Sequence, residues 1–144
     1  MKTMFFLLIP TILVMACSLG PEPIRFGHDS CDHCKMVIMD PKFGAELVTK
    51  KGKVYKLDDV NCLLAFQEEN LIADQDVAHF LVVDFGQPES LIDVNNAFFI
   101  YSIEIRSPMA SGLAAFSDEP LMEKYYTDWG GEKLSWSGVK KLFE

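Results

Sequence analysis

The feature that most constrains the fold is an apolar run near the N-terminus that ends at a cysteine. Lys2 gives a basic start, residues 5–14 are mostly apolar, and Ala16 and Cys17 follow. The run is too short to cross a hydrocarbon core of about 30 Å as a helix, so it predicts a signal peptide over residues 1–16. The domain must therefore fold from the residues that follow, in a compartment where disulfides form.

The residues from Val14 to Cys17 have the order of a lipobox, with an aliphatic residue, any residue, a small residue and then cysteine. We expect the Cys17 thiol to receive diacylglycerol, because several acyl chains on one cysteine give lasting anchorage. The alternative is an ordinary secretory signal with a chance cysteine. Residues 17–27 would form a lipidated tether. Ser18 favours the outer membrane, facing the periplasm, if the cell has one.

Composition narrows the classes of protein that the chain can belong to. The 144 residues suffice for one domain, and 49% hydrophobic with 24% charged residues is typical of a globular protein. The net charge of −8 argues against a nucleic-acid partner, since phosphate binding requires a basic surface.

Three cysteines remain after Cys17, namely Cys31, Cys34 and Cys62. In a compartment where disulfides form, an odd number leaves at least one thiol that is buried, free or bound to another group. This odd number is the first indication of a metal.

Local patterns predict the same order of elements twice. In the first half, residues 46–49 and 54–57 predict a hairpin in which Gly52 supplies a positive φ. Asp58 or Asp59 can cap a helix over residues 60–70, and residues 77–85 predict a buried strand.

The second half gives strands over residues 97–105 and 113–116, followed by a helix that Ser117 or Asp118 caps. Gly130 and Gly131 end this helix. A strand over residues 133–136 and a last helix capped by Ser137 complete the unit. The sequence therefore predicts an α+β fold of two consecutive ββαβ-type units, over residues 45–86 and 97–144, packed as one compact domain spanning residues 28–144.

The segment from Cys31 to Met36, Cys-Asp-His-Cys-Lys-Met, is the strongest candidate for a functional site. A structural zinc site would need a second pair of ligands at similar spacing, and none is readable. A thioredoxin-like motif should open a helix within a βαβ unit, whereas this one follows a Pro-rich tether. Thiolates and a thioether together favour Cu(I), for which methionine is a good ligand. The sequence predicts one Cu(I), with Cys34, Cys31 and Met36 among its ligands.

Other side chains are candidate ligands of the same site. Met109 lies on a loop bounded by proline and glycine and is a candidate ligand, while His28 and His33 could each add an imidazole. Three further residues are expected to be structural, with Cys62 as an inert buried thiol and His79 as a core histidine within an apolar strand. They are Met39, Cys62 and His79.

Several segments of the mature chain resemble the NosL family of copper lipoproteins. They are residues 29–36, residues 43–55, Asp58-Asp59 leading into Cys62-Leu63-Leu64, and Pro108-Met109 with Gly112 and Ala115-Phe116. The resemblance covers essentially the whole mature chain, and one departure is Ala110, where many members have glycine.

The resemblance implies a pair of small ββαβ-type units and a chaperone that delivers Cu(I) to the catalytic copper cluster of nitrous-oxide reductase. It carries Cys34 and Met36 over as the best-matched ligands, with Cys31 and Met109 as additions. The expected partner is apo-nitrous-oxide reductase or another copper-accepting envelope protein. Because no Ser-His-Asp set, paired carboxylates or phosphate loop is readable, we do not expect an enzyme.

Overall fold

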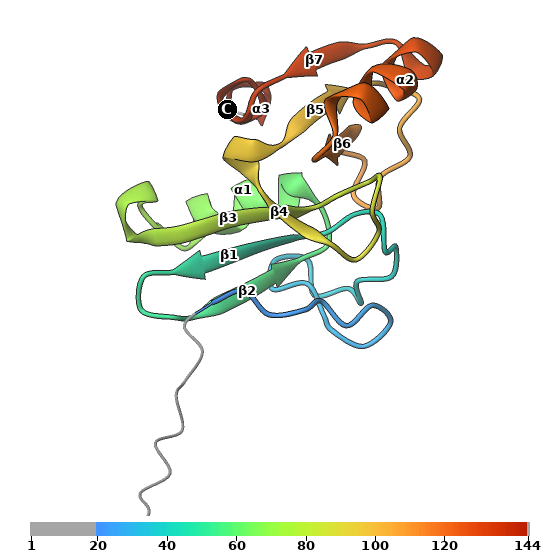
Figure 1. Ribbon diagram of the computed structural model, residues 1–144. Helices are drawn as coiled ribbons and strands as arrows, with labels where there is room; N and C mark the ends of the chain where they lie inside the picture. Colours follow the sequence, from blue (N-terminus) through green and yellow to red (C-terminus); the bar gives the residue numbers. More distant parts are fainter. Residues whose placement is uncertain (1–19, 144) are drawn as a thin grey trace, which may run out of the picture.

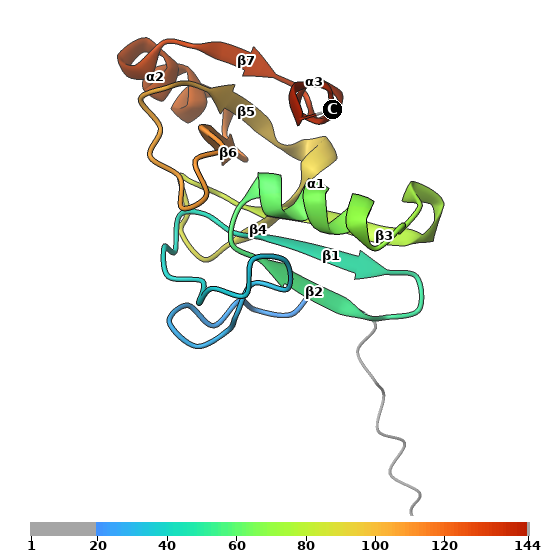
Figure 2. The same ribbon diagram turned by 180° about the vertical axis from the view of Figure 1, so that it is seen from behind.

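The structure, a computed structural model, describes residues 20–143. It consists of two antiparallel sheets, each accompanied by a helix (Figures 1 and 2). The first sheet has the strand order β2-β1-β3-β4 and the second has the order β6-β5-β7. In each sheet the first strand is central, the second strand pairs on one side of it and the third on the other. The α+β class and the repeated ββαβ order are therefore confirmed.

The elements follow one another closely along the chain. The first unit contains β1 (Ala45–Thr49), β2 (Val54–Leu57), α1 (Val60–Glu69), the short 3-10 helix η1 (Asp74–Asp76), β3 (Val77–Val83) and β4 (Leu91–Asp93). After the 3-10 helix η2 (Val94–Asn96), the second unit contains β5 (Phe98–Tyr101), β6 (Leu113–Phe116), α2 (Glu119–Trp129), β7 (Glu132–Leu134) and α3 (Trp136–Phe143).

Several predicted element bounds were wrong. Strands β3 and β7 end at Val83 and Leu134, each two residues before the expected end. Strand β5 stops at Tyr101, four residues before the expected end, and β4 was not foreseen because it has only three residues. Helix α3 begins at Trp136, so Ser137 does not cap it. Instead the Ser135 hydroxyl accepts a hydrogen bond from the backbone N–H of Gly138, at 3.4 Å.

The core of the first unit lies between its sheet and α1. Ala45 and Leu47 alternate with Glu46 along β1, and both belong to the same buried cluster as Leu63 of α1. Leu47 and Leu63 are fully buried, and burying a leucine side chain contributes about 2 kcal/mol. This packing fixes the direction of α1 against the strands, and with it the position of the first turn of the helix.

An aromatic cluster joins the two units. Phe85, which follows β3, packs edge-on against Trp129 of α2 and lies beside Phe116 of β6. The backbone N–H of Phe85 also donates to the carbonyl of Ala115, at 2.8 Å. The two sheets are thus held as one domain by side-chain packing and by a backbone contact between them.

The segment before the cysteine motif lies on the first sheet. Ile24 is buried, and the backbone N–H of Glu22 donates to the Glu46 carboxylate. Lys56 of β2 forms an ion pair with the buried Asp29, at 2.8 Å. Residues 22–27, which the sequence places in the tether, therefore contact the domain, while Cys17 and the expected signal peptide lie outside the described residues. None of the helices found among residues 20–143 has the length and apolar character needed to cross a membrane.

Two loop positions depend on a positive φ. Gly52 has a φ of 80° in the β1–β2 turn, as the sequence predicted. Ala110 has a φ of 57°, in the left-handed region that glycine adopts without steric cost. Ala110 therefore adopts a backbone conformation that favours glycine, the residue that many members of the resembled family have at this position.

We predict that Ala110→Gly raises the free energy of unfolding by about 0.5–1 kcal/mol, because it removes a left-handed alanine. Urea unfolding followed by circular dichroism would measure this change. The matched control is Ala78→Gly, at an exposed position in β3 without a positive φ, which should instead lose about 0.5–1 kcal/mol. A loss of stability in Ala110→Gly would contradict the account.

Candidate metal centre

The cysteine motif forms a closed turn. The backbone N–H of Cys31 donates to the carbonyl of Met36 at 2.8 Å, and that of Lys35 donates to the carbonyl of Cys31 at 3.0 Å. An antiparallel bridge between Ser30 and Val37 closes the base of the turn, and Lys35 adopts a positive φ of 66° within it. This geometry directs Cys31 and Cys34 towards one point, and no helix begins at the motif.

The turn is attached to the end of β2. The backbone N–H of Asp32 donates to the carbonyl of Lys56, and the backbone N–H of Lys56 donates to the Asp32 carboxylate, each at 2.8 Å. These reciprocal bonds hold the turn against the strand that leads directly into α1. The two cysteine-bearing segments are therefore positioned by a shared strand.

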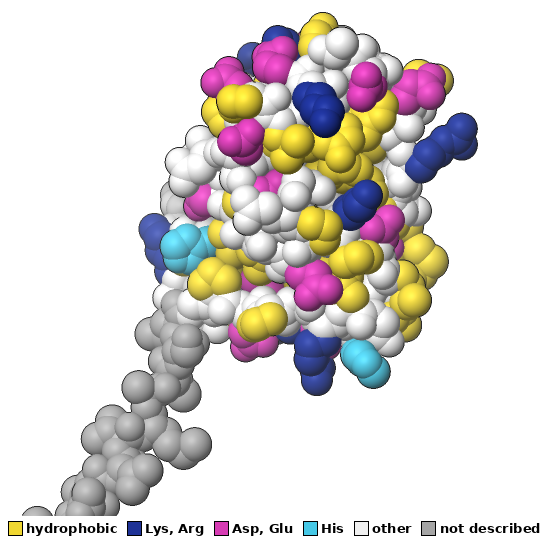
Figure 3. Space-filling view, turned by 45° about the vertical axis from the view of Figure 1, so that its right-hand side comes forward, with side chains coloured by type: hydrophobic (Ala, Val, Ile, Leu, Met, Phe, Trp, Pro, Cys, Tyr) yellow, Lys and Arg dark blue, Asp and Glu magenta, His cyan; other side chains and the backbone are white. Residues whose placement is uncertain are grey.

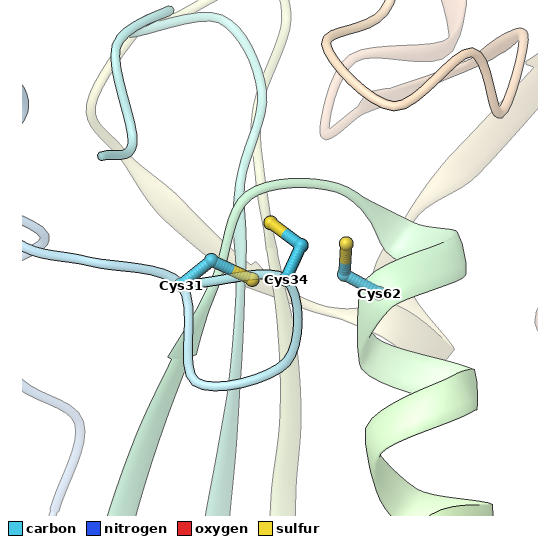
Figure 4. Close-up of side chains that lie close together, drawn as sticks. All are labelled: Cys31, Cys34 and Cys62. Atoms are coloured by element: carbon cyan, nitrogen blue, oxygen red, sulfur yellow. The ribbon is translucent and has the colours of Figure 1, made fainter. Parts of the chain in front are cut away.

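The first turn of α1 supplies the third cysteine. The Asp59 carboxylate accepts a hydrogen bond from the backbone N–H of Val60 at 2.7 Å and so caps the helix. Cys62 follows on the buried face, with 2% of its surface exposed. Its side chain points to the turn that carries the other two cysteines (Figure 4).

The sulfur atoms of Cys31, Cys34 and Cys62 all lie within 4.8 Å of one another. Cys31 is fully buried and Cys34 is partly exposed. The expectation that Cys62 is an inert core thiol missed this contact, because 28 residues separate it from Cys34 and only the tertiary fold brings them together. The odd number of cysteines was the one sequence signal that could have implicated it.

The three thiols differ in acidity. The Cys62 thiol donates a hydrogen bond to Cys31 and this contact lowers the pKa of Cys31 most, with backbone N–H groups of Cys34, Asp58 and His33 adding to it against the effect of burial. The same hydrogen bond, together with burial, raises the pKa of Cys62. Burial raises the pKa of Cys34. Cys31 is thus the most acidic of the three thiols.

The surroundings of the cluster are acidic. Burial, together with the negative charges of Cys31, Asp59 and Asp40, raises the pKa of Asp58 to about 6. A cation placed among the sulfurs would relieve this repulsion and would displace the remaining thiol protons.

The two predicted methionine ligands lie on segments that contact the cysteine-bearing elements. Met36 lies on the cysteine turn, where its backbone N–H donates to the Cys34 sulfur and 49% of its surface is exposed. Met109 is partly buried and packs against the core cluster that includes Cys31 and Cys62.

The histidines and Met39 take other places. His33 Nε2 lies 3.2 Å from the Glu69 carboxylate, and His28 is exposed. Met39 is 65% exposed. His79 is also exposed, so the prediction that it is a buried core histidine was wrong.

Asp59 ties the Met109 loop to α1. Besides capping the helix, its carboxylate accepts hydrogen bonds from the Ser111 hydroxyl at 2.7 Å and from the backbone N–H of Met109 at 3.2 Å. The Asn61 side chain donates to the carbonyl of Met109 at 2.8 Å. A loop of the second unit is therefore held at the helix turn that carries Cys62.

The fold and the converging thiols define a small protein with a candidate thiolate metal site. The NosL family model matches residues 24–142. The chain belongs to the NosL family. No significant match is found among curated proteins.

A solved structure has a similar fold. It is described as the crystal structure of the copper chaperone NosL from Shewanella denitrificans. It superposes with a TM-score of 0.69 at 22% sequence identity, over 83% of this chain and 94% of that one.

We predict that Asp59→Ala lowers the free energy of unfolding by about 3 kcal/mol, because it removes a helix cap and leaves buried donors without acceptors. Asp118→Ala is the matched control, since Asp118 caps α2 at an exposed position through the backbone N–H of Leu121. That variant should lose only about 1 kcal/mol. Equal losses in urea unfolding would contradict the role of Asp59 in joining the two units.

Proposed function

We propose that this chain is a lipid-anchored carrier that holds one Cu(I) between Cys31, Cys34 and Cys62 and passes it to a copper-accepting enzyme of the cell envelope. The convergence of three cysteine sulfurs within 4.8 Å is the observation that carries the proposal. Copper is the cargo of the protein and not a resident cofactor.

The donor set favours Cu(I) over zinc. Structural zinc almost always takes four ligands, whereas Cu(I) is a soft ion that binds thiolates in low coordination. Within residues 20–143, only these three His, Cys, Asp or Glu side chains converge in this way. Three thiolates would leave zinc one ligand short.

The surroundings favour a carrier over a thiol-disulfide oxidoreductase. The Cys31–Cys34 motif lies in a turn closed by the Ser30–Val37 bridge and does not open a helix, as a thioredoxin-like motif would. Cys34 is the partly exposed member of the cluster. An incoming thiolate, thioether or imidazole can therefore attack the ion from the side of Cys34.

Met36 is suited to assist this exchange. Its backbone contacts the Cys34 sulfur while its side chain is about half exposed. Val37 and Met39 are exposed on the same segment, and Figure 3 shows hydrophobic side chains between charged ones on this side of the molecule. We propose that Met36, together with Met109, offers thioether sulfur as the ion enters or leaves.

Nitrous-oxide reductase is the acceptor that we propose. The family resemblance supports this client, while the description of the Shewanella denitrificans relative as a copper chaperone supports copper as the cargo. An acceptor in the same compartment would meet a carrier that the Cys17 lipid confines to the membrane surface.

We predict that the reduced mature protein binds about one Cu(I) more tightly than Zn(II). Cys34→Ser and Cys62→Ala should each weaken Cu(I) binding at least about tenfold, or 1.4 kcal/mol, and Met36→Leu should weaken it less. Competition with a chromophoric Cu(I) chelator would measure the affinities. They should fall as the pH falls, because Cys34 and Cys62 must lose protons.

The control is Met39→Leu, which alters an exposed methionine outside the cluster and should leave the affinity unchanged. If Cys62→Ala binds Cu(I) as tightly as the wild type, Cys62 is not a ligand and the three-thiolate site is wrong. Tighter binding of zinc than of copper at neutral pH would remove the copper assignment.

We also predict that Cys17→Ser moves the protein from the membrane to the soluble fraction, because the acylated thiol is lost. Cell fractionation and mass spectrometry of the N-terminal peptide would show this. A variant that still carries a covalent lipid would show that Cys17 is not the anchor.

A further inference from the structure

One end of the first unit combines exposed lysines with exposed apolar side chains. We call residues 50–53, 68–76 and 140–143 the lysine end. Leu71 and Ile72 line one groove together with Lys50, Lys51 and Lys53, and a second groove together with Lys140 and Phe143. The shared leucine and isoleucine make these grooves one continuous surface.

The charge of the lysine end differs from that of the whole chain. It contains five lysines and four carboxylates, whereas the chain has 13 Lys and Arg against 21 Asp and Glu. Asp74 pairs with Lys140 at 3.0 Å, which leaves four lysines and three carboxylates, and Glu69 lies 3.2 Å from His33. The lysines of the β1–β2 turn are exposed. This end is thus a weakly basic surface on a strongly acidic protein.

Leu71 is an unusual residue for its position. It follows the Asn70 cap of α1 with a φ of 51°, where glycine or asparagine is preferred. Its side chain is 91% exposed. A leucine that strains the backbone and gains no burial adds nothing to the stability of the isolated domain, but it would gain from contact with an apolar phase.

The described chain begins on the same side. Glu22 contacts Glu46, the second residue of β1, and Ile24 lies beside Gly44, just before the strand. Tracing back from Ile24 to Gly20 therefore leads towards the β1–β2 turn, as Figures 1 and 2 both show. An anchor attached before Gly20 would bring this end closest to the membrane.

The cysteine cluster lies towards the other end of α1. Cys62 is in the first turn of the helix, whereas Leu71 follows its last turn. The ten residues of α1 span about 15 Å.

We propose that the lysine end rests on an anionic phospholipid surface, with Leu71 inserted among the head groups, so that the cysteine cluster faces away from the membrane. The orientation rests on the proposed lipid anchor and adds a second, electrostatic contact to it. Lysines near an anionic surface attract it within a Debye length, while the acidic remainder of the domain is repelled. The lipid alone would let the domain rotate about its tether. The lipid and the lysine end together would hold the domain in one orientation on the membrane.

The test uses the full-length lipidated protein in vesicles of phosphatidylcholine and phosphatidylglycerol whose acyl chains carry bromine, a quencher of tryptophan. Leu71→Trp places a reporter at the lysine end. Ile103→Trp is the matched control, because Ile103 is 90% exposed in the loop between β5 and β6. The same measurement on the parent protein gives the quenching of the native Trp129 and Trp136, which is subtracted.

We expect strong quenching of Leu71→Trp and none of Ile103→Trp. The quenching should disappear in phosphatidylcholine alone, at high salt, and when Lys50, Lys51 and Lys53 are all changed to glutamine. Absence of quenching at residue 71, equal quenching at both positions, or quenching that ignores lipid charge would overturn the orientation. Protein that does not float with the vesicles would reject the anchor and this orientation together, whereas floating protein without quenching would reject the orientation alone.

Discussion

The proposed copper site depends on three cysteine sulfurs that two separate segments hold within 4.8 Å of one another. Neither segment needs a metal for its own order. Hydrogen bonds within the turn and to Lys56 fix Cys31 and Cys34, while the Asp59 cap and the packing of α1 on its sheet fix Cys62. A site assembled in this way is preorganised, so little of the binding free energy is spent on ordering the chain.

The same helix turn joins the site to the second unit. Asp59, three residues before Cys62, binds the loop that contains Met109 and Ser111. The two sheets also meet through Phe85, which follows β3, and Ala115 of β6. The two units therefore contribute differently to the site. The first unit supplies the cysteine thiols, and the second supplies the loop that contains Met109.

Local sequence patterns predicted the secondary structure better than they predicted the cysteine site. The β1–β2 hairpin, the α1 cap at Asp59 and the α2 cap at Asp118 follow from a few neighbouring residues, and the structure confirms them. Cys62 could not be assigned in this way, because its partners depend on how α1 packs against β1 and on where the turn attaches to β2. The expectation for His79 failed for a related reason, since an apolar neighbourhood in sequence does not determine which face of a strand is buried.

X-ray absorption at the copper edge of the Cu(I)-bound protein tests the central claim most directly. The account predicts a first shell made only of sulfur, without the outer-shell scattering of an imidazole, and the loss of one sulfur in Cys62→Ala. A shell that contains histidine nitrogen, or one that is the same in wild type and Cys62→Ala, would contradict a site built from Cys31, Cys34 and Cys62.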